Sequence, residues 1–522
     1  MSFLSENILS LLIFLPLLGA ACLALIPSDR KEALRWTAFG ASLLVFALAV
    51  GLLVDFQCAF PTLQHVERRP WIPDWGIQWY VGADGLNLLL IVLTAFLTPI
   101  VVLSAFSAVQ DGVKGYYVSM LLLETGMMGT LAALDLFLFY VFWELMLIPM
   151  FLLIGIWGGP RRVYAAIKFV LFTMVGSLPM LVAVIYLYQT HAQQFGTYSA
   201  SLVDLLKVDL DLNTQLWLFG AFALAFAIKV PLFPLHTWLP DAHVEAPTGG
   251  SVILAGVLLK MGTYGFCRFA MPLFPEAARY SAPLFQTLAV IGIVYGALVS
   301  LVQPDIKKLV AYSSVSHLGF VVLGLFTLEV AGLQGAIYAM ISHGLTTGAL
   351  FLLVGVIYER RHTRSIEEFG GLAKQMPVYA TLLVFAVLGS AGLPGLSGFV
   401  GEFLVLLSAF SLPNKLYVLF AATGLILGAV YLLWLVQKVL FGPLGPKNQK
   451  LKDVNFREMC YLVPVIVMIV WLGLFPNMWL DTMRASAEHW VGSFDHYSLS
   501  TACNPSPAAA QLALRLPGTE AR

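Results

Sequence analysis

The stretch FAIKVPLFPLHTWLPDAH (residues 226–243) closes a long apolar segment and decides how the chain folds there. It contains one lysine, three prolines, two histidines and an aspartate. Proline removes a backbone donor and breaks a helix, and free backbone groups at membrane depth are tolerated only where protein or a water-lined cavity satisfies them. The stretch therefore predicts a discontinuous membrane helix with ionisable side chains at its break.

The composition of the whole chain is that of a membrane protein. Of its 522 residues, 59% are hydrophobic and 11% are charged, whereas an average soluble domain has about a quarter charged residues. We therefore expect an all-α polytopic membrane protein with a single membrane domain over residues 1–522. The formal net charge is zero, so the composition indicates no nucleic-acid partner.

The sequence carries no motif for a redox centre or a nucleotide. The five cysteines are far apart and no CxxC pair occurs, so we expect no iron–sulfur or zinc site in this chain. Neither a GxGxxG after a strand nor a GxxxxGK(S/T) motif is present. The first residues, MSFLSENILSLLIFLPLLGA (1–20), lack a basic region, so we interpret them as a retained first span and not as a signal peptide.

About fourteen apolar runs approach the roughly 20 residues that cross a bilayer. The expected spans are 7–27, 34–54, 86–107, 116–134, 136–157, 164–188, 214–230, 249–271, 283–302, 306–327, 331–357, 379–411, 416–441 and 459–478. Lysine and arginine gather in the loops after the odd-numbered spans, which places both termini on the outer side. The tail, residues 480–522, starts amphipathic and ends rich in proline and alanine, and we assign it no function.

A second interrupted segment matches the first one. VLGSAGLPGLSGFVGEFLVLL (387–407) places glycines and a proline inside the twelfth span, five spans after the break in the seventh. Since five is odd, the two units point in opposite directions, which is typical of an inverted repeat whose broken helices mark an ion path. We therefore expect repeats over spans 4–8 (116–271) and 9–13 (283–441). The alternative is that both breaks are packing kinks.

Several ionisable side chains fall at membrane depth. Such a charge costs at least ~2.5–3.5 kcal/mol on insertion scales, so a functional role is the default interpretation. The alternatives are snorkelling to the surface for Lys168, pairing with a neighbouring helix for Glu124, and helix packing for the histidines. The candidate proton-carrying residues are Glu144, Lys229, His236, Lys260, His317, His343 and Glu402.

These residue types suit proton transfer. Burial disfavours the charged form of a lysine or carboxyl group, and a nearby opposite charge favours it. Making and breaking a Glu144–Lys229 pair would therefore hold and release a proton, and histidine can relay it. A chain of such groups could carry protons outward, or exchange protons for a metal cation, and the residues alone leave both possibilities open.

Five segments closely resemble one known family. They are FWELMLIPMFLLIGIWGG (142–159), FPLHTWLPDAHVEAPTGGSVILAGVLLKMGTYG (233–265), QPDIKKLVAYSSVSHLGF (303–320), GAIYAMISHGLTTGALFLLVG (335–355) and GLPGLSGFVGEFLVL (392–406). The family is that of subunit M, an antiporter-like subunit of bacterial NADH-quinone oxidoreductase (respiratory complex I), whose mitochondrial counterpart is NADH dehydrogenase subunit 4. The resemblance covers roughly spans 3–14.

The resemblance implies a multi-pass subunit of the bacterial inner membrane, with periplasmic termini, that pumps protons from cytoplasm to periplasm. NADH oxidation and quinone reduction would occur in partner subunits, with NADH, FMN, iron–sulfur clusters and quinone there and no cofactor here. It implies that Glu144 and Lys229 form the coupling pair and that Lys260 is the central connecting lysine. It further implies that Glu402 serves the exit side, and that three histidines line the polar axis: His236, His317 and His343.

Partners implied by the resemblance are the other membrane subunits of complex I, including the paralogous antiporter-like subunits, and phospholipid is a plausible neighbour. Two other functions remain open at this point, and a third, quinone chemistry in this chain, ranks last because the sequence has no pocket signature for it. The first is a subunit of a multisubunit sodium/proton antiporter or of a membrane hydrogenase. The second is a scaffold that holds the membrane arm together without pumping.

Overall fold

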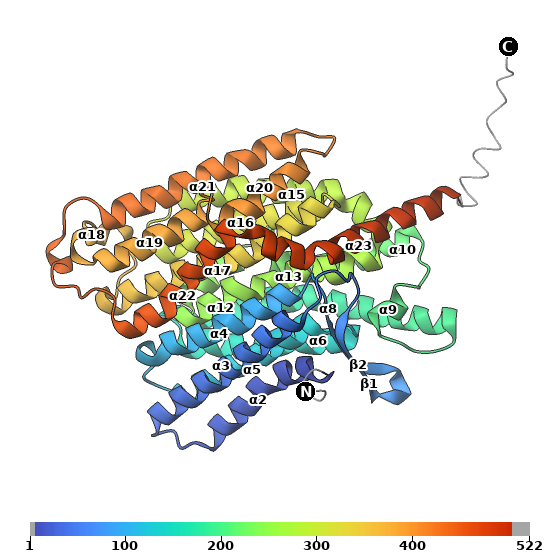
Figure 1. Cartoon of the computed structure of the whole chain (residues 1–522), viewed down its shortest axis with the longest axis horizontal. Coiled ribbons are helices and arrows are strands. Elements are labelled where there is room, and N and C mark those ends of the chain that lie inside the picture. The colour runs from blue at the N-terminus through green and yellow to red at the C-terminus, as the bar shows by residue number, and fades with distance from the viewer. Residues whose placement is uncertain (1–5, 504–522) are drawn as a thin grey trace, which may run out of the picture.

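The computed structural model describes the backbone of residues 6–503 and the side chains of residues 6–494. Its long helices run roughly parallel to one another and form a single bundle (Figure 1). The first helices lie at one edge of this bundle, and α21 (Leu416–Leu440) lies at the opposite edge. The chain is therefore a helical membrane protein, as the composition predicts.

Twelve helical segments in the described residues are long and apolar enough to cross a membrane. Ten of them are single helices. Seven of these are α2 (Ile8–Leu25), α3 (Lys31–Asp55), α4 (Leu88–Ala108), α8 (Arg162–Phe195), α15 (Pro275–Leu301), α16 (Ile306–Leu325) and α17 (Val330–Arg361). The other three are α10 (Leu212–Lys229), α21 and α22 (Phe456–Leu474). The remaining two are composite, namely α6 (Leu136–Leu145) with α7 (Leu147–Trp157), and the segment Thr248–Leu273.

The other two expected spans correspond to elements that fall outside this set of twelve. One is α5 (Val113–Ala132), which is 20 residues long and contains Glu124. The other is divided into two shorter apolar helices, α19 (Pro377–Ser390) and α20 (Ser397–Ala409). Each of the two expected repeat units thus has an interrupted fourth element, while their inverted relation stays a prediction.

The two interruptions lie where proline and glycine occur in the sequence. α10 ends at Lys229, and the chain becomes helical again in α11 (Trp238–Glu245). Between α19 and α20, Gly392 and Gly395 have φ values of 76° and 92°. An L-residue with a Cβ rarely adopts this left-handed conformation, so glycine is what allows the chain to turn there.

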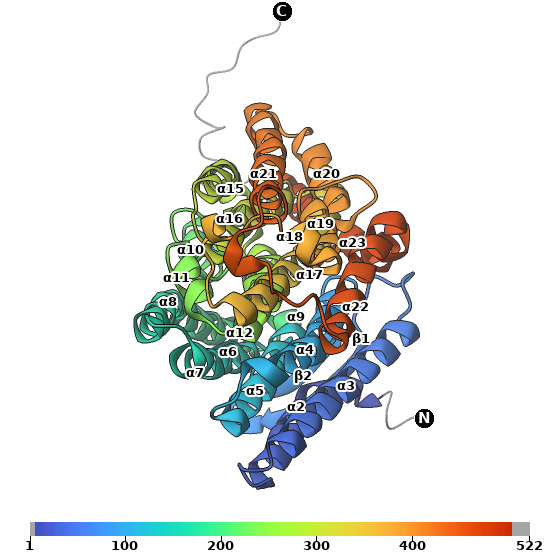
Figure 2. The same ribbon diagram turned by 90° about the vertical axis from the view of Figure 1, so that its left-hand side faces the viewer.

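Two elements at the centre of the bundle are buried along their length. α17 lies near the middle of the bundle in the end-on view (Figure 2). It packs against the segment Thr248–Leu273, in which α13 (Leu259–Gly265) stands between two π-helical turns, η2 (Leu254–Leu258) and η3 (Phe266–Ala270). A helix that is apolar on all sides is a core helix, and the ionisable groups in the middle of these two elements, Lys260 and His343, are buried.

The expected all-helical fold has one addition in the described residues. β1 (Gln64–Ile72) and β2 (Ile77–Ala83) form an antiparallel hairpin in the long loop between α3 and α4. The expected amphipathic tail begins as α23 (Pro476–Cys503), which runs along the bundle toward the end where the hairpin lies (Figure 1). Residues 504–522 of that tail lie outside the described residues.

Candidate functional site

Lys260 and His343 meet at the centre of the bundle. The Nζ atom of Lys260 lies 2.7 Å from Nδ1 of His343, and both side chains are buried. Lys260 also donates a hydrogen bond to the carbonyl oxygen of Ala255, which lies in the π-helical turn η2. π-helical turns inside α-helices occur frequently at functional sites, and here the turn supplies a polar partner for a buried lysine.

His317 and Glu402 form a second contact in the adjoining half. Nδ1 of His317 lies 2.7 Å from Oε1 of Glu402. The other ring nitrogen, Nε2, lies 3.2 Å from the hydroxyl of Tyr431 and 3.4 Å from that of Ser390. Both ring nitrogens of His317 therefore have polar neighbours, and a proton accepted at one of them can be released from the other.

The two contacts join into one row of ionisable groups. The ring centroids of His317 and His343 are 5.8 Å apart, and a small cavity between them also has Ser342 and Glu402 in its wall. Lys260, His343, His317 and Glu402 thus follow one another across four elements. The structure brings together four of the seven predicted residues, although they are as far apart in sequence as 260 and 402.

The break in the twelfth expected span explains how Glu402 reaches this row. Glu402 follows Gly401 in the first turns of α20. A Cβ atom on Gly401 would lie only 2.7 Å from the backbone nitrogen of Ala339 in α17. Glycine therefore permits the backbones of α20 and α17 to approach closely, and this contact holds the Glu402 carboxylate beside His317.

Glu144 and Lys229 lie in the first expected repeat unit (116–271), near each other but without a direct ion pair. Lys229 ends α10, is buried, and has no hydrogen-bond partner for Nζ within the described part of the chain. Its Nζ lies 5.1 Å from the ring centroid of Trp143 and 5.6 Å from that of Phe169. The charge of Glu144 acts on Lys229, yet no contact within 4.0 Å joins them among the described residues. The expected coupling pair is thus in its separated arrangement.

His236 lies apart from the row. It is buried beside the second half of the broken helix, with its ring centroid 5.1 Å from Tyr295 and 5.7 Å from Phe233. Its Nδ1 has no hydrogen-bond partner among residues 6–494. The ring of Tyr312 is 6.4 Å away and belongs to α16, which also carries His317. Aromatic rings, and no hydrogen bond among the described residues, therefore lie between His236 and the row that contains His317.

The alternatives weighed for Lys168 and Glu124 have different outcomes. Lys168 of α8 forms an ion pair with Asp241 of α11, with Nζ 2.7 Å from Oδ2. This pair ties the second half of the broken helix to α8, in place of the snorkelling that was weighed as an alternative. Glu124 is fully buried beside Thr98 of α4, and it forms no ion pair with any basic side chain that the structure describes.

Lys307 was not among the predicted residues. It is buried, and its Nζ donates to the carbonyl oxygen of Ala246, at a distance of 2.5 Å, just beyond the end of α11. Arg364 donates similarly to the carbonyl oxygen of Val244, at 2.6 Å. Positive charges favour the carbonyl end of a helix. In the sequence, Lys307 stands next to Lys308 at the very start of the expected span 306–327, where a lysine ordinarily faces water, so it gave no signal of a buried site.

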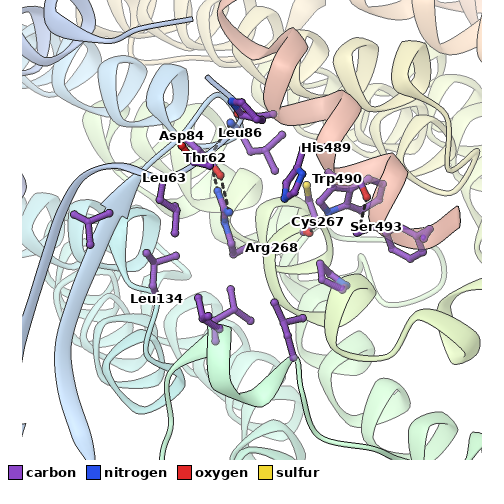
Figure 3. A pocket seen from close by; sticks show the side chains of 18 of the residues that line it. Thr62, Leu63, Asp84, Leu86, Leu134, Cys267, Arg268, His489, Trp490 and Ser493 are labelled. Atoms are coloured by element: carbon purple, nitrogen blue, oxygen red, sulfur yellow. Dashed lines mark hydrogen bonds and ion pairs between the residues drawn. The ribbon is translucent and has the colours of Figure 1, made fainter. Parts of the chain in front are cut away.

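A separate cavity lies at the end of the bundle that carries the β-hairpin. It has a volume of about 550 Å³ and lies between the β-hairpin, η3 and α23. In its wall, Arg268 points toward Asp84, with nitrogen–oxygen distances of 2.8 and 2.5 Å (Figure 3). Trp490 of α23 lines the same cavity and donates to the carbonyl oxygen of Cys267. None of the seven predicted residues lines this cavity.

The described residues form no recognisable metal site. No group of three or more histidine, cysteine, aspartate or glutamate side chains within residues 6–494 is arranged to hold a metal ion.

The chain is similar to a known family over most of its length. The family described as "NADH:quinone oxidoreductase/Mrp antiporter, TM" matches residues 133–429. NADH-quinone oxidoreductase subunit M of Rhodobacter capsulatus is 46% identical over 509 residues, which are 95% of this chain and 98% of that relative. NADH-ubiquinone oxidoreductase chain 4 of Marchantia polymorpha is 44% identical over 491 residues, or 93% of this chain and 98% of the relative.

Solved structures share the fold. A chain of respiratory complex I from Thermus thermophilus with bound NADH superposes with a TM-score of 0.85 at 36% identity, covering 93% of this chain and 99% of that one. The membrane-bound sulfane sulfur reductase, an archaeal respiratory membrane complex, gives a TM-score of 0.81 at 24% identity, over 91% and 77% of the two chains. The Mrp complex of Dietzia gives 0.78 at 23%, over 98% and 57%. The last two similarities concern the fold alone.

Proposed function

Because the chain belongs to the subunit M family, the antiporter-like membrane subunits of NADH-quinone oxidoreductase, we propose that it carries protons across the membrane along its row of buried ionisable groups. The row runs from Lys260 through His343 and His317 to Glu402. The observation that carries the proposal is the pair of 2.7 Å contacts, one between Lys260 and His343 and one between His317 and Glu402. A proton relay needs contacts of this kind between ionisable groups in an apolar interior. A passive membrane anchor has no need of them.

Each group in the row has a chemical role. The Lys260 amine takes up a proton and hands it to the neighbouring imidazole of His343, with which it already shares a hydrogen-bonding distance. The histidines relay it because an imidazole accepts at one nitrogen and releases at the other. The Glu402 carboxylate accepts it, becomes a carboxylic acid, and then releases the proton on the outer side. Each transfer moves one proton and leaves the covalent structure unchanged.

The Glu144–Lys229 pair serves as the switch in the first half. In the separated arrangement, the Lys229 ammonium faces the rings of Trp143 and Phe169, and a buried ammonium without a carboxylate partner is poised to release its proton. Return of Glu144 to contact would hold the proton in place. Contact or separation of this pair would therefore control whether a proton reaches the row that begins at Lys260. His236, which lies just past the break, extends this half toward the axis.

The complex to which this family belongs supplies the driving energy. We propose that NADH, FMN, iron–sulfur clusters and quinone are held by partner subunits, and that this chain holds no redox centre. Its neighbours would be the other membrane subunits, including the paralogous antiporter-like ones, with phospholipid around them. The loop charges support a bacterial inner-membrane orientation with periplasmic termini, so protons move from cytoplasm to periplasm.

The decisive experiment replaces Lys260 by methionine in the intact complex. Lys260→Met keeps the length of the side chain but removes the amine. We expect normal assembly, with proton pumping and coupled NADH oxidation both reduced about tenfold or more, on the scale of a lost acid–base group. Lys450→Met, at an exposed lysine of the loop before α22, is the matched control and should leave both rates unchanged.

The experiment also separates the two other functions. If Lys260→Met pumps at the normal rate, the chain is a scaffold and the proposed relay is wrong. If pumping in the unmodified complex requires sodium and moves it, the chain exchanges protons for a cation, as the sodium/proton antiporter alternative predicts. The similarity to the Mrp complex is at the level of fold, so it does not favour that alternative over proton pumping.

A further inference from the structure

A cavity opens where the chain leaves α15, α17 and α21 at the same end of the bundle. It has a volume of about 720 Å³, and its wall is formed by residues of the segments 301–304, 366–370 and 434–443. The loops after α17 and α21 are rich in lysine and arginine. In the proposed orientation, the cavity therefore lies on the cytoplasmic side of the membrane.

Backbone hydrogen bonds hold the walls of this cavity in place. The N–H group of Ile366 donates to the carbonyl oxygen of Pro304 at 2.9 Å, and that of Gly371 donates to the carbonyl oxygen of Phe441 at 3.0 Å. The loop after α17 is thereby tied on one side to the loop after α15 and on the other side to the end of α21. The cavity is a fixed part of the fold.

Two side chains of opposite charge lie in the cavity wall. Lys438 is in the last turn of α21, and Glu367 is in the short turn η4 (Ile366–Glu368) after α17. Both side chains are exposed, and neither forms an ion pair with any side chain that the structure describes. One free cation and one free anion in a single cavity fit a ligand that itself carries both charges.

Apolar helix faces lead from the membrane to this cavity. On α21, Val430, Trp434 and Lys438 follow one another at intervals of four residues and so share one face of the helix. On α15, Leu298 and the next residue past the helix end, Val302, also share one face, and they are 48% and 72% exposed. α15 and α21 pack side by side at the edge of the bundle (Figure 2).

Trp434 indicates the depth of the cavity in the membrane. Tryptophan is enriched at the membrane–water interface, because its ring is apolar and its N–H group is polar. Trp434 lines the cavity one turn before Lys438, and apolar side chains follow on the membrane side. The cavity therefore lies at the level of the lipid headgroups.

We propose that this cavity binds the headgroup of one zwitterionic aminophospholipid, phosphatidylethanolamine, from the cytoplasmic leaflet. The ammonium group of Lys438 binds the phosphate, and the carboxylate of Glu367 accepts hydrogen bonds from the ethanolamine ammonium group. The acyl chains lie along the exposed faces of α15 and α21. This inference rests on the membrane placement in the proposed function and names one lipid of that surrounding bilayer, but it does not depend on the proton relay.

The charges of the cavity favour this lipid over two common alternatives. Phosphatidylglycerol carries a net negative charge, and Glu367 disfavours it because like charges repel each other. Phosphatidylcholine has no N–H group that could donate to the Glu367 carboxylate. The opposing interpretation is that Lys438 only stabilises the carbonyl end of α21 and that Glu367 only faces water. In that case an ordinary lipid shell covers this edge without preference.

The experiment places the intact complex in phosphatidylcholine nanodiscs that contain a small fraction of phosphatidylethanolamine with a photoreactive group next to its headgroup. After irradiation, mass spectrometry identifies the labelled peptides. We expect labels within residues 291–304 and 426–443. Unlabelled phosphatidylethanolamine should suppress this labelling about threefold more effectively than phosphatidylcholine or phosphatidylglycerol, on the scale of one exposed ion pair.

Two variants and a control assign the charges. Lys438→Gln should lower the labelling about threefold, because the phosphate loses its cation. Glu367→Gln should remove the preference for phosphatidylethanolamine over phosphatidylglycerol, because the carboxylate no longer repels the anionic headgroup. Lys450→Gln, at an exposed lysine outside the cavity wall, should change neither quantity.

Three outcomes overturn the inference. The first is absence of labels in both segments, which means that a partner subunit covers the cavity in the complex. The second is equal suppression by the three lipids, which indicates an ordinary lipid shell only. The third is labelling that neither Lys438→Gln nor Glu367→Gln changes. None of these outcomes bears on the relay, which Lys260→Met decides separately.

Discussion

Nδ1 of His317 lies 2.7 Å from Oε1 of Glu402, although 85 residues separate them in the chain. His317 is on α16, and Glu402 follows the break between α19 and α20. The contact therefore joins α16 and α20 through two largely buried ionisable side chains.

Removing the acid from this pair tests its role. Glu402→Gln keeps the shape of the side chain and an oxygen that can accept from His317, but it cannot release a proton. We expect pumping to fall about tenfold or more while assembly stays normal. Glu402→Asp, which keeps the carboxyl group on a shorter stem, should retain more activity than the glutamine variant. Equal pumping by Glu402→Gln and the unmodified complex would place the exit elsewhere.

The chemistry of Lys229 can be separated from its charge. Arginine keeps a positive charge but does not release its proton in proteins. If Lys229 must release a proton, Lys229→Arg and Lys229→Ala should both lower coupled NADH oxidation and pumping about tenfold or more. The two rates are measured together in vesicles with a check of assembly. Pumping by Lys229→Arg close to the normal rate would show that charge alone is sufficient.

The close contact at Gly401 predicts a long-range effect of one methyl group. In Gly401→Ala, the added Cβ would lie 2.7 Å from the nitrogen and 2.8 Å from the Cα of Ala339. Backbone atoms cannot move aside cheaply, so α20 must shift away from α17, and overpacking of this kind costs about 1–3 kcal/mol. We expect a lower melting temperature and impaired pumping, because Glu402 moves with α20.

Gly428 offers a matched control for that variant. It lies in α21, and no atom stands within 4 Å of the position where its Cβ would be. Gly428→Ala adds the same methyl group to a helix and should be neutral or slightly stabilising, because alanine favours helix more than glycine does by about 1 kcal/mol. Equal melting temperatures and equal pumping of the two alanine variants would contradict the close-packing argument.

The buried Arg268–Asp84 pair, in the cavity between the β-hairpin, η3 and α23, should stabilise the fold. Asp84→Leu leaves the Arg268 guanidinium buried without its carboxylate, and breaking a buried pair costs about 3–5 kcal/mol. The double variant Asp84→Leu/Arg268→Leu removes both charges and should be more stable than the single one. Melting temperatures and the yield of assembled complex measure the difference. A double variant less stable than Asp84→Leu would mean that the arginine has a further role.

Asp135 gives a dependence of stability on pH. Its carboxylate accepts hydrogen bonds from the backbone N–H groups of Gln78, Phe137 and Leu138, yet burial raises the pKa of Asp135 to about 6. The folded protein therefore binds this proton more tightly than the unfolded chain. The contribution of Asp135 to stability is fully present below about pH 4 and declines as the pH rises to about 6, by an amount on the order of 2 kcal/mol.

Asp135→Asn removes this titration and one acceptor of the loop. The difference in melting temperature between the unmodified complex and Asp135→Asn should therefore shrink as the pH rises from 4 to 6, and then stay constant. A difference independent of pH across that window would show that Asp135 does not titrate there. The comparison of two proteins at each pH cancels the contributions of the other ionisable groups.

The sequence by itself determined the class of the fold and most of the candidate residues. Hydrophobic runs of bilayer length can be recognised without knowing their neighbours, because each membrane helix satisfies its own backbone. Proline and glycine mark the interruptions near Lys229 and Glu402 for a similarly local reason. Charges at membrane depth stand out because they are costly, so all seven candidates could be named from the chain alone.

Only the tertiary structure decided which of these residues meet. The contacts of Lys260 with His343 and of His317 with Glu402 join residues 83 and 85 positions apart. They depend on helix packing that no local pattern specifies. The same holds for the separation of Glu144 from Lys229 and for the buried position of Lys307, which stands in the sequence where a lysine ordinarily faces water. A local pattern records what each residue can do, whereas the partners of a buried charge are set by how distant helices pack against one another.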